Sequence, residues 1–236
     1  MNKHAVILAG GKGSRLRPYT VVLPKPLMPI GEYPILEVII RQLVLQGFTQ
    51  ITLAVNHQAE LIAAFFGDGS KWGISINYSL EDQPLGTMGP LKLIKDLPDN
   101  FLVMNGDILT DLVYKDFYET HVNSDALFSI SSHVREEKID YGVLQTENHI
   151  LTGFKEKPTK SFEVSMGIYM LNKKVLDYIP DNTAFGFDQL MLSLLDQKKN
   201  VFVNTYKGLW LDIGRPDDYI EAIECFDQLK DKILYV

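Results

Sequence analysis

The chain has 236 residues, of which 46% are hydrophobic, enough for one large α/β domain or two small ones with a substantial core. Its net charge of −7 argues against duplex nucleic acid or an anionic membrane as the main partner, because either would favour a clustered basic surface. A single cysteine, Cys225, excludes an intrachain disulfide, and the N-terminal apolar run is too short for a signal peptide. We therefore expect a cytoplasmic protein without a membrane span.

The first predicted strand is the apolar run 5–8, which is typical of a strand buried on both faces of a parallel sheet. It leads into Gly10, Gly11 and Gly13, where the backbone can turn sharply and offer free N–H groups to an anion such as phosphate. A Rossmann dinucleotide fingerprint is excluded because Leu16 stands where its third Gly belongs, and a Walker loop is excluded because no Lys follows the last Gly. The glycines alone are also compatible with a tight strand-to-helix connection.

Strand-like and helix-like segments alternate over the next part of the chain. The patterns predict helices over 35–43, 57–66 and 114–123, and strands over 51–55, 74–79, 101–104 and 126–131. Alternating strands and helices favour a parallel sheet flanked by helices. From Tyr141 the pattern changes to strand-like runs at 141–145, 150–156 and 164–171, which predict an antiparallel section forming a lid over the substrate side. Helices at 175–179, 189–198 and 216–229 and an edge strand at 201–206 complete the prediction.

The segment 8–26, LAGGKGSRLRPYTVVLPKP, resembles the opening of the sugar-phosphate nucleotidyltransferases, also called nucleotide-sugar pyrophosphorylases. The resemblance implies a nucleotide-diphospho-sugar transferase fold: a Rossmann-like, mostly parallel sheet flanked by helices, with a smaller antiparallel sugar-side lid. It also implies that Arg15 grips the departing pyrophosphate and that Lys25 lies beside the α-phosphate of a nucleoside triphosphate. The planar guanidinium group of Arg and the compact ammonium group of Lys can both stabilise phosphoryl oxygens whose negative charge increases during the reaction. The nucleotide-binding residues implied by this segment are Leu8, Gly10, Gly11, Gly13, Ser14 and Arg15.

Two carboxylates are the candidates for a Mg²⁺ site. Asp107 follows the predicted strand 101–104. Asp212 lies in Trp210-Leu211-Asp212-Ile213-Gly214-Arg215-Pro216, which resembles the second metal-binding motif of the family. Mg²⁺ prefers one or two carboxylates together with phosphate oxygens and water. An isolated Asp at a strand end is more often a turn former or a helix cap, so this assignment depends on both motifs occurring in the order of the family.

The loop Leu85-Gly86-Thr87-Met88-Gly89-Pro90 resembles the base-reading loop of mannose-1-phosphate and heptose-1-phosphate guanylyltransferases. The resemblance implies that Gly86 and Thr87 contact the nucleobase of the nucleotide. Met88 stands where members of the family usually carry Ala. Glu81 could accept hydrogen bonds from the amide and amine of guanine, whereas a uracil or thymine reader would more naturally present an amide. Guanine is therefore the predicted base, and the alternative for Glu81 is a solvated carboxylate.

The sugar-side residues implied by the resemblance lie in the second half of the chain. Glu156-Lys157-Pro158 resembles the motif whose Glu meets sugar hydroxyls and whose Lys meets the sugar phosphate, and Gly142 offers its backbone N–H. Ser165 stands where relatives commonly carry Asn, so its sugar contact departs from the family pattern. No linker or repeat divides the chain, which predicts one domain over 1–236 with a nucleotide-binding half at about 1–110 and a sugar-phosphate-binding half at about 111–236.

The predicted reaction is Mg²⁺-assisted nucleotidyl transfer from a nucleoside triphosphate, with GTP favoured, to a mannose- or heptose-type sugar 1-phosphate. Its catalytic residues are Arg15, Lys25 and Asp107, and the sequence leaves homo-oligomerisation open. A thymidylyl- or uridylyltransferase for glucose 1-phosphate is the first alternative. A silent regulatory homologue is disfavoured because both cations and both metal-site carboxylates are present, and a cytidylyltransferase for a non-sugar phosphate is disfavoured by the sugar-side motif.

Overall fold

A seven-stranded sheet forms the centre of the molecule in the computed structural model, which describes residues 2–56 and 58–234. Its strand order is β12-β8-β11-β6-β1-β4-β5. β11 runs antiparallel to its neighbours β6 and β8, and the other adjacent strands are parallel, which confirms a mixed, mostly parallel sheet. The strands are β1 (Lys3–Leu8), β4 (Phe48–Val55), β5 (Ser75–Leu80), β6 (Asn100–Asn105), β8 (Phe128–Lys138), β11 (Thr159–Asn172) and β12 (Val201–Tyr206).

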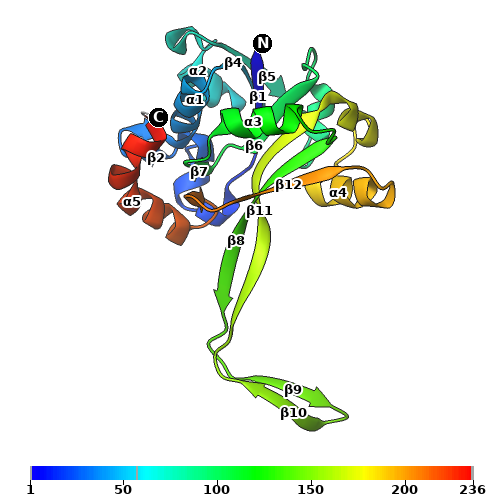
Figure 1. The fold of residues 1–236 in the computed structure, drawn as a ribbon. Coiled ribbons are helices and arrows are strands. Elements are labelled where there is room, and N and C mark those ends of the chain that lie inside the picture. The colour runs from blue at the N-terminus through cyan, green and yellow to red at the C-terminus, as the bar shows by residue number, and fades with distance from the viewer. Residues whose placement is uncertain (1, 57, 235–236) are drawn as a thin grey trace.

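Helices cover both faces of this sheet (Figure 1). They are α1 (Ile35–Leu45), α2 (Ala59–Phe66), α3 (Tyr114–Val122), α4 (Phe187–Asp196) and α5 (Pro216–Leu234). α4 contributes buried residues to one core cluster, and the other four contribute to a second. Neighbouring residues of β1 alternate between the clusters, since Ala5 and Ile7 pack in one and Val6 in the other. β1 is thus buried on both faces, as its continuous apolar run predicts.

Most predicted elements are found, with shifted ends. α2 begins at Ala59, and the predicted start at His57 lies outside the described residues. The segment predicted as a helix at 175–179 is a 3-10 helix, Lys173–Tyr178, in which the Asn172 side chain accepts the Lys174 N–H at 3.1 Å. α5 continues to Leu234 because Ile233 and Leu234 still bury apolar surface in the core.

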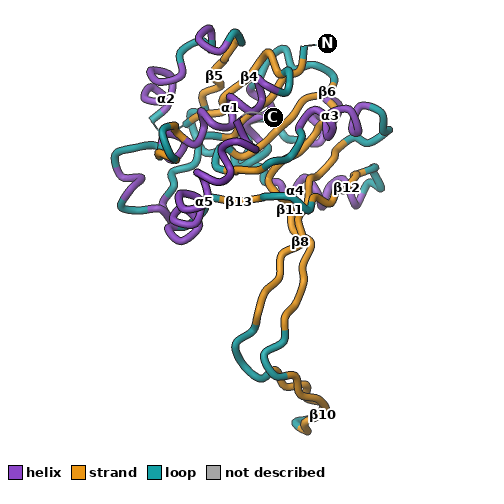
Figure 2. The backbone as a smooth tube through the Cα atoms, turned by 60° about the vertical axis from the view of Figure 1, so that its left-hand side comes forward, coloured by secondary structure: helices purple, strands orange, loops and turns teal. Residues whose placement is uncertain are grey.

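Small antiparallel sheets extend the body. β2 (Pro29–Ile30) pairs with β3 (Tyr33–Pro34), β7 (Ile108–Thr110) with β13 (Trp210–Asp212), and β9 (Val143–Glu147) with β10 (Ile150–Lys155). Figures 1 and 2 show β8 and β11 leaving the body as a long ribbon that carries the β9–β10 hairpin at its far end. The predicted antiparallel section is confirmed, but the hairpin expected to form a lid projects away from the body in this conformation.

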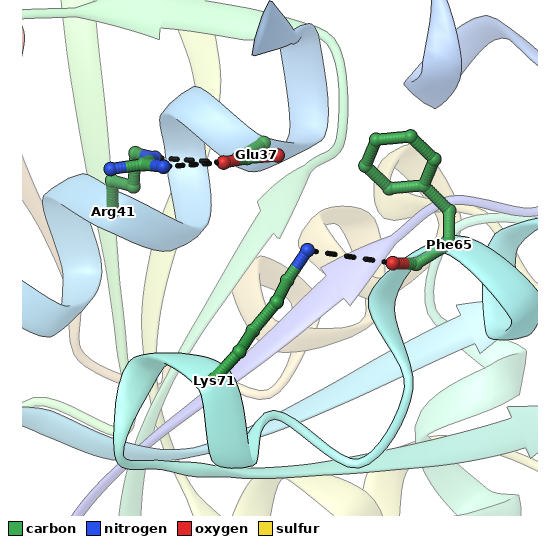
Figure 3. Close-up of polar contacts among 4 residues, drawn as sticks. All are labelled: Glu37, Arg41, Phe65 and Lys71. Atoms are coloured by element: carbon green, nitrogen blue, oxygen red, sulfur yellow. Dashed lines mark hydrogen bonds and ion pairs between the residues drawn. The ribbon is translucent and has the colours of Figure 1, made fainter.

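Polar contacts stabilise α1 and the turn that follows α2 (Figure 3). Arg41 donates from Nε and a terminal nitrogen to Glu37 Oε1 at 2.9 and 2.7 Å, one turn apart on α1. Lys71 Nζ donates to the Phe65 carbonyl at 3.5 Å and lies 3.9 Å from the Trp72 ring centroid, which ties the end of α2 to the following turn. Across the described residues, no helix combines the length and apolar character that a bilayer crossing requires.

Candidate active site

The loop after β1 is shaped by its glycines. Gly13 has φ +58, and a Cβ placed there would lie 2.9 Å from Thr20 Cγ2 and 3.3 Å from Lys25 Cβ. Thr20 Oγ1 donates to the Gly13 carbonyl at 2.6 Å, which closes the loop over the 3-10 helix Ser14–Leu16. Gly11 has open space around it, so its backbone is accessible from the cavity that it lines. The loop is therefore closely packed at Gly13 and open at Gly11.

Lys25 and Asp107 form an ion pair although 82 residues separate them in the sequence. Their side chains are only 11% and 23% exposed, so the charges interact in a partly desolvated environment. Asp107 follows β6, and the Gly106 N–H donates to the Leu8 carbonyl at 3.0 Å, which fixes this turn beside the end of β1. The second carboxylate oxygen of Asp107, Oδ1, is buried and has no hydrogen-bond partner. One oxygen of Asp107 therefore remains available to a ligand.

Asp212 is brought beside Asp107 by the pairing of β13 with β7. Asp212 lies opposite Ile108, and the Ile213 N–H donates to the Asp107 carbonyl at 3.0 Å. Desolvation and the charge of Asp107 raise the pKa of the Asp212 carboxyl, against the opposing effects of Lys25 and Arg15. A cation between the two carboxylates would relieve their repulsion.

The donor set fits a hard divalent cation. Two carboxylates meet here, and Asp107 keeps an unpartnered buried oxygen. The described part of the chain contains no group of three or more His, Cys, Asp or Glu side chains arranged as metal ligands. A cation bound at Asp107 and Asp212 would therefore take its other ligands from water or from phosphate oxygens, as Mg²⁺ commonly does.

A cavity of about 370 Å³ opens at the carboxyl ends of β1, β4 and β6. This is the edge where ligands collect in open α/β sheets. The cavity is lined by predicted residues from three separate segments and by Lys12, Asn56 and Asn105, which the sequence reasoning did not single out. The predicted residues among its walls are Leu8, Gly10, Gly11, Glu81, Gly86, Thr87 and Asp107.

Glu81 and Gly86 form the far wall of this cavity. Glu81 is 9% exposed; its Oε2 accepts the Leu85 N–H at 3.0 Å, and burial raises the pKa of its carboxyl. Gly86 has φ +77, and a Cβ there would lie 2.7 Å from the Phe185 carbonyl oxygen, so the loop can pass this close only as glycine. Thr87 Oγ1 accepts the Phe187 N–H at 2.8 Å, while Met88 is fully buried in the core. Met88 is not among the residues that line this cavity.

A second cavity, of about 440 Å³, is lined by Asp212. Arg15 lines it, and a Cβ on Gly214 would lie 3.7 Å from both terminal nitrogens of that guanidinium. Arg135 on β8 and Arg215 before α5 also line it, and the sequence reasoning missed both. Arg135 is a lone arginine in its stretch of sequence, whereas Arg215 belongs to the motif around Asp212, where no role was predicted for it. Only the approach of β8 to the start of α5 brings the two arginines together.

The predicted sugar-side residues lie apart from this cluster. Gly142, Glu156 and Lys157 belong to the outer part of the projecting ribbon, and a Cβ on Gly142 would meet the Phe154 ring at 2.6 Å. Ser165 Oγ donates to the Tyr169 hydroxyl at 3.1 Å and lines an apolar groove rather than the cavity with the three arginines. The structure thus brings Arg15, Lys25, Asp107 and Asp212 together and leaves the four sugar-side assignments as predictions.

Comparisons with a family model and with curated proteins show which proteins this chain resembles in sequence. The family model described as nucleotidyl transferase matches residues 4–228. A UTP–glucose-1-phosphate uridylyltransferase from Synechocystis is 35% identical over 93% of this chain and 62% of the relative. A mannose-1-phosphate guanyltransferase from Candida albicans is 32% identical over 92% of this chain and 62% of the relative. The chain spans somewhat less than two thirds of the length of these curated relatives.

Solved structures agree with the sequence comparisons. A Bacillus anthracis protein, provisionally assigned as a glucose-1-phosphate thymidylyltransferase and crystallised with sucrose, superposes with a TM-score of 0.76 at 26% identity, covering 94% of both chains. HddC from Yersinia pseudotuberculosis in complex with GMP-PN superposes with a TM-score of 0.73 at 28% identity, covering 95% of this chain and 99% of that one. The nucleotide-diphospho-sugar transferase fold is therefore confirmed, and the chain belongs to the nucleotidyl transferase family.

Proposed function

We propose that the chain transfers a nucleotidyl group from a nucleoside triphosphate to a sugar 1-phosphate and releases pyrophosphate. The observation that carries the proposal is the meeting of Lys25, Asp107, Asp212 and Arg15 between two cavities, since Asp107 lines one cavity and Asp212 and Arg15 line the other. Two anionic substrates could thus be held on either side of one charged cluster. This arrangement suits a reaction between two phosphates.

The chemistry needs no protein nucleophile. An oxygen of the sugar phosphate forms a bond to the α-phosphorus, and the bond from that phosphorus to the oxygen leading to the β-phosphate breaks, so that pyrophosphate leaves with the electron pair. Lys25 would neutralise charge on the α-phosphoryl oxygens. Arg15 lines the second cavity, so its planar fork would hold phosphate oxygens on that side of the cluster, and its assignment to the departing pyrophosphate stays a prediction of the resemblance. Asp107 and Asp212 would hold Mg²⁺, which supplies positive charge to the phosphoryl oxygens when bound.

We further propose that Arg135 and Arg215 receive the phosphate of the sugar substrate. Both line the cavity that also contains Arg15 and Asp212. Their guanidinium groups make no ion pair within 4.0 Å among the described residues, so they are available to an anion. The remaining walls include Trp210 and His133, whose ring centroids lie 5.5 Å apart with the planes inclined at 36°, and the carboxylates of Glu137, Asp218 and Glu221.

GTP is the proposed nucleotide, with a mannose- or heptose-type sugar. Glu81 supports guanine because Oε1 faces Gly10 at the cavity wall, where a Cβ would lie 3.1 Å from it, while Oε2 is occupied by the Leu85 N–H. The guanyltransferase from Candida albicans and the HddC complex with GMP-PN also favour this base. The second candidate is a glucose-1-phosphate uridylyl- or thymidylyltransferase, which the Synechocystis and Bacillus anthracis likenesses favour.

The test is pyrophosphate release with Mg²⁺ across GTP, UTP, dTTP, CTP and ATP against mannose, glucose and heptose 1-phosphates. A dominant signal for GTP with mannose or heptose 1-phosphate is expected, and a dominant signal for UTP or dTTP with glucose 1-phosphate would favour the second candidate. The Asp107→Asn variant, run in parallel, identifies signal from contaminating enzymes. No turnover with any pair, together with tight binding of a nucleotide-sugar, would contradict the enzymatic proposal and indicate a regulatory homologue.

A further inference from the structure

The strand that carries Asp212, β13, is short and weakly paired. It is three residues long and forms a two-stranded sheet with β7, in which Asp212 lies opposite Ile108. A two-stranded pair is marginally stable in water by itself. The same strand brings the Asp212 carboxylate close to that of Asp107, and these like charges repel each other. The position of Asp212 therefore depends on contacts outside this short ladder.

One carboxylate oxygen holds both ends of the connection that leads into β13. The chain reaches β13 from β12 through only three residues, 207–209. Asp111 Oδ1 accepts the Tyr206 hydroxyl, at the end of β12, at 2.5 Å and the Leu209 N–H at 2.6 Å. Burial and the hydrogen bond to Asp111 raise the pKa of the Tyr206 phenol, so this group remains a donor at neutral pH. Because β12 belongs to the main sheet, Asp111 links that sheet to the residue that precedes β13.

The two aspartates that flank β7 bind the two ends of β13. Asp107 directly precedes β7, and its carbonyl accepts the Ile213 N–H at 3.0 Å. Asp111 directly follows β7, and its side chain accepts the Leu209 N–H. Thr110 Oγ1 donates to the Leu209 carbonyl at 2.6 Å, so side chains at the end of β7 bind both backbone polar groups of Leu209. These contacts extend the ladder beyond its last backbone pair and fix its register.

Gly208 shows how closely these groups are packed. A Cβ on Gly208 would overlap the Tyr206 hydroxyl oxygen and lie 2.6 Å from Asp111 Oδ1. A side chain at this position would therefore push the hydroxyl and the carboxylate apart. Asp111, Tyr206 and Gly208 are not among the residues that line the two cavities of the site. Contact with a substrate thus does not account for this packing.

We propose that Asp111 is a positioning residue for the divalent-cation site. By binding the Tyr206 hydroxyl and the Leu209 N–H, it holds β13 in register with β7 and so keeps the Asp212 carboxylate beside Asp107 against their repulsion. The inference rests on the proposed function, because it gives the two carboxylates the cation that nucleotidyl transfer would use. Removing a side chain that orients metal ligands typically weakens metal binding about 10–100-fold. The competing interpretation is that Asp111 only stabilises the fold.

Trp210 reports the position of β13 without any ligand. The chain has two tryptophans, so labelling with 5-fluorotryptophan gives two ¹⁹F resonances, which a Trp72→Phe variant assigns. Trp210 Nε1 donates to the Met166 carbonyl at 3.1 Å, so a displacement of β13 changes the surroundings of this ring. Asp111→Ala is expected to shift or broaden the Trp210 resonance and to leave the Trp72 resonance unchanged.

Asp68→Ala is the matched control for this measurement. Asp68 Oδ1 also accepts a backbone N–H, that of Ser70, at 3.0 Å, and Ser70 begins the 3-10 helix that contains Trp72. This variant should therefore change the Trp72 resonance alone and leave cation binding unchanged.

Binding of Mn²⁺, followed by electron paramagnetic resonance with no nucleotide present, measures the cation site. The binding that Asp107→Asn abolishes defines the site. Asp111→Ala is expected to weaken this binding about tenfold or more. Asp111→Asn should retain most of it, because an amide oxygen can accept both hydrogen bonds without the charge. Equal losses for the two variants would show that Asp111 acts through its charge and would contradict the proposal.

An unmoved Trp210 resonance or an unchanged Mn²⁺ affinity in Asp111→Ala overturns the proposal. Gly208→Ala displaces the same hydrogen-bonded pair and leaves the carboxylate in place, so it should reproduce both effects and serves as the test if Asp111→Ala does not fold. Failure of the proposed function has a different signature. If the unmodified chain releases no pyrophosphate with any substrate pair but binds Mn²⁺ in a manner that Asp111→Ala weakens, nucleotidyl transfer is refuted and the positioning role is supported.

Discussion

At the scale of single residues, the site depends on side chains that only the fold brings into contact. Lys25 and Asp107 are paired and mostly buried, and Asp107 keeps one buried oxygen without a partner. An unpartnered buried oxygen is costly unless a ligand uses it. The pairing therefore supports a functional role for Asp107 beyond neutralising one lysine.

We predict that Asp107→Asn lowers turnover about 10²–10³-fold, because the amide keeps the shape of the carboxylate and removes the charge that would hold a cation. The midpoint of thermal unfolding should change little, which circular dichroism checks. Asp231→Asn, at an exposed position on α5, is the control and should leave the rate unchanged. A wild-type rate for Asp107→Asn would remove this residue from the reaction.

We predict that Arg135→Gln raises KM for the sugar 1-phosphate about tenfold and leaves KM for the nucleoside triphosphate unchanged, since Arg135 lines only the second cavity. Steady-state kinetics with each substrate varied in turn measures both constants. Lys198→Gln removes a charge from an exposed position after α4 that lines neither cavity, and should change neither constant. An equal rise in both constants would instead indicate a general loss of structure or charge.

At the scale of elements, two glycines in the loop after β1 have different surroundings, one closely packed and one open. Gly13 has φ +58 and has Thr20 and Lys25 as close neighbours, whereas Gly11 has no atom within 4 Å of where a Cβ would stand. The same substitution should therefore act differently at two positions only two residues apart.

Gly13→Ala is expected to destabilise the fold by about 1–2 kcal/mol from the left-handed backbone alone, lowering the unfolding midpoint by about 3–6 °C. Gly11→Ala should leave that midpoint unchanged and weaken nucleotide binding, because its methyl group enters the first cavity. Scanning calorimetry measures stability and fluorescence titration measures nucleotide affinity. Equal stability losses for both variants would show that the loop is packed differently.

At the scale of the whole molecule, two buried histidines tie distant elements together. His4 of β1 lies 2.8 Å from Thr52 Oγ1 of β4, and His121 of α3 lies 2.7 Å from Ser129 Oγ of β8. Both are 1% exposed, and burial lowers the pKa of each to about 4. Each ring is held neutral in the folded protein and can take up a proton freely only on unfolding.

Stability should therefore fall on acidification. The unfolded chain binds more protons than the folded one between pH 6.5 and about 4, so the free energy of unfolding is highest above pH 6.5 and decreases as the pH falls through that window. From pH 7 to pH 5 the expected loss is about 2 kcal/mol per histidine. Urea unfolding at the two pH values measures it. His121→Gln should reduce the pH dependence by about half, whereas His149→Gln, on the exposed hairpin, should not change it.

The sequence patterns predicted most of the body correctly. Continuous apolar runs identified β1, β4 and β6, because a strand that is buried on both faces has apolar side chains at successive positions. The periodicity of 35–43 identified α1, because a helix that is buried along one side has apolar side chains three and four residues apart. The segment 175–179 proved to be a 3-10 helix, since its short length carries too little periodicity to distinguish the two helix types.

Local sequence by itself determined the glycine loop, the strands that end at the site and the identity of the charged residues at those ends. Only the tertiary structure decided that Lys25 pairs with Asp107, that β13 sets Asp212 beside it, and that Arg135 and Arg215 share a cavity. It also decided that the antiparallel section projects as a ribbon rather than covering the site. Spacing along the chain encodes the direction of side chains within an element, whereas the meeting of two elements depends on packing between residues far apart in sequence.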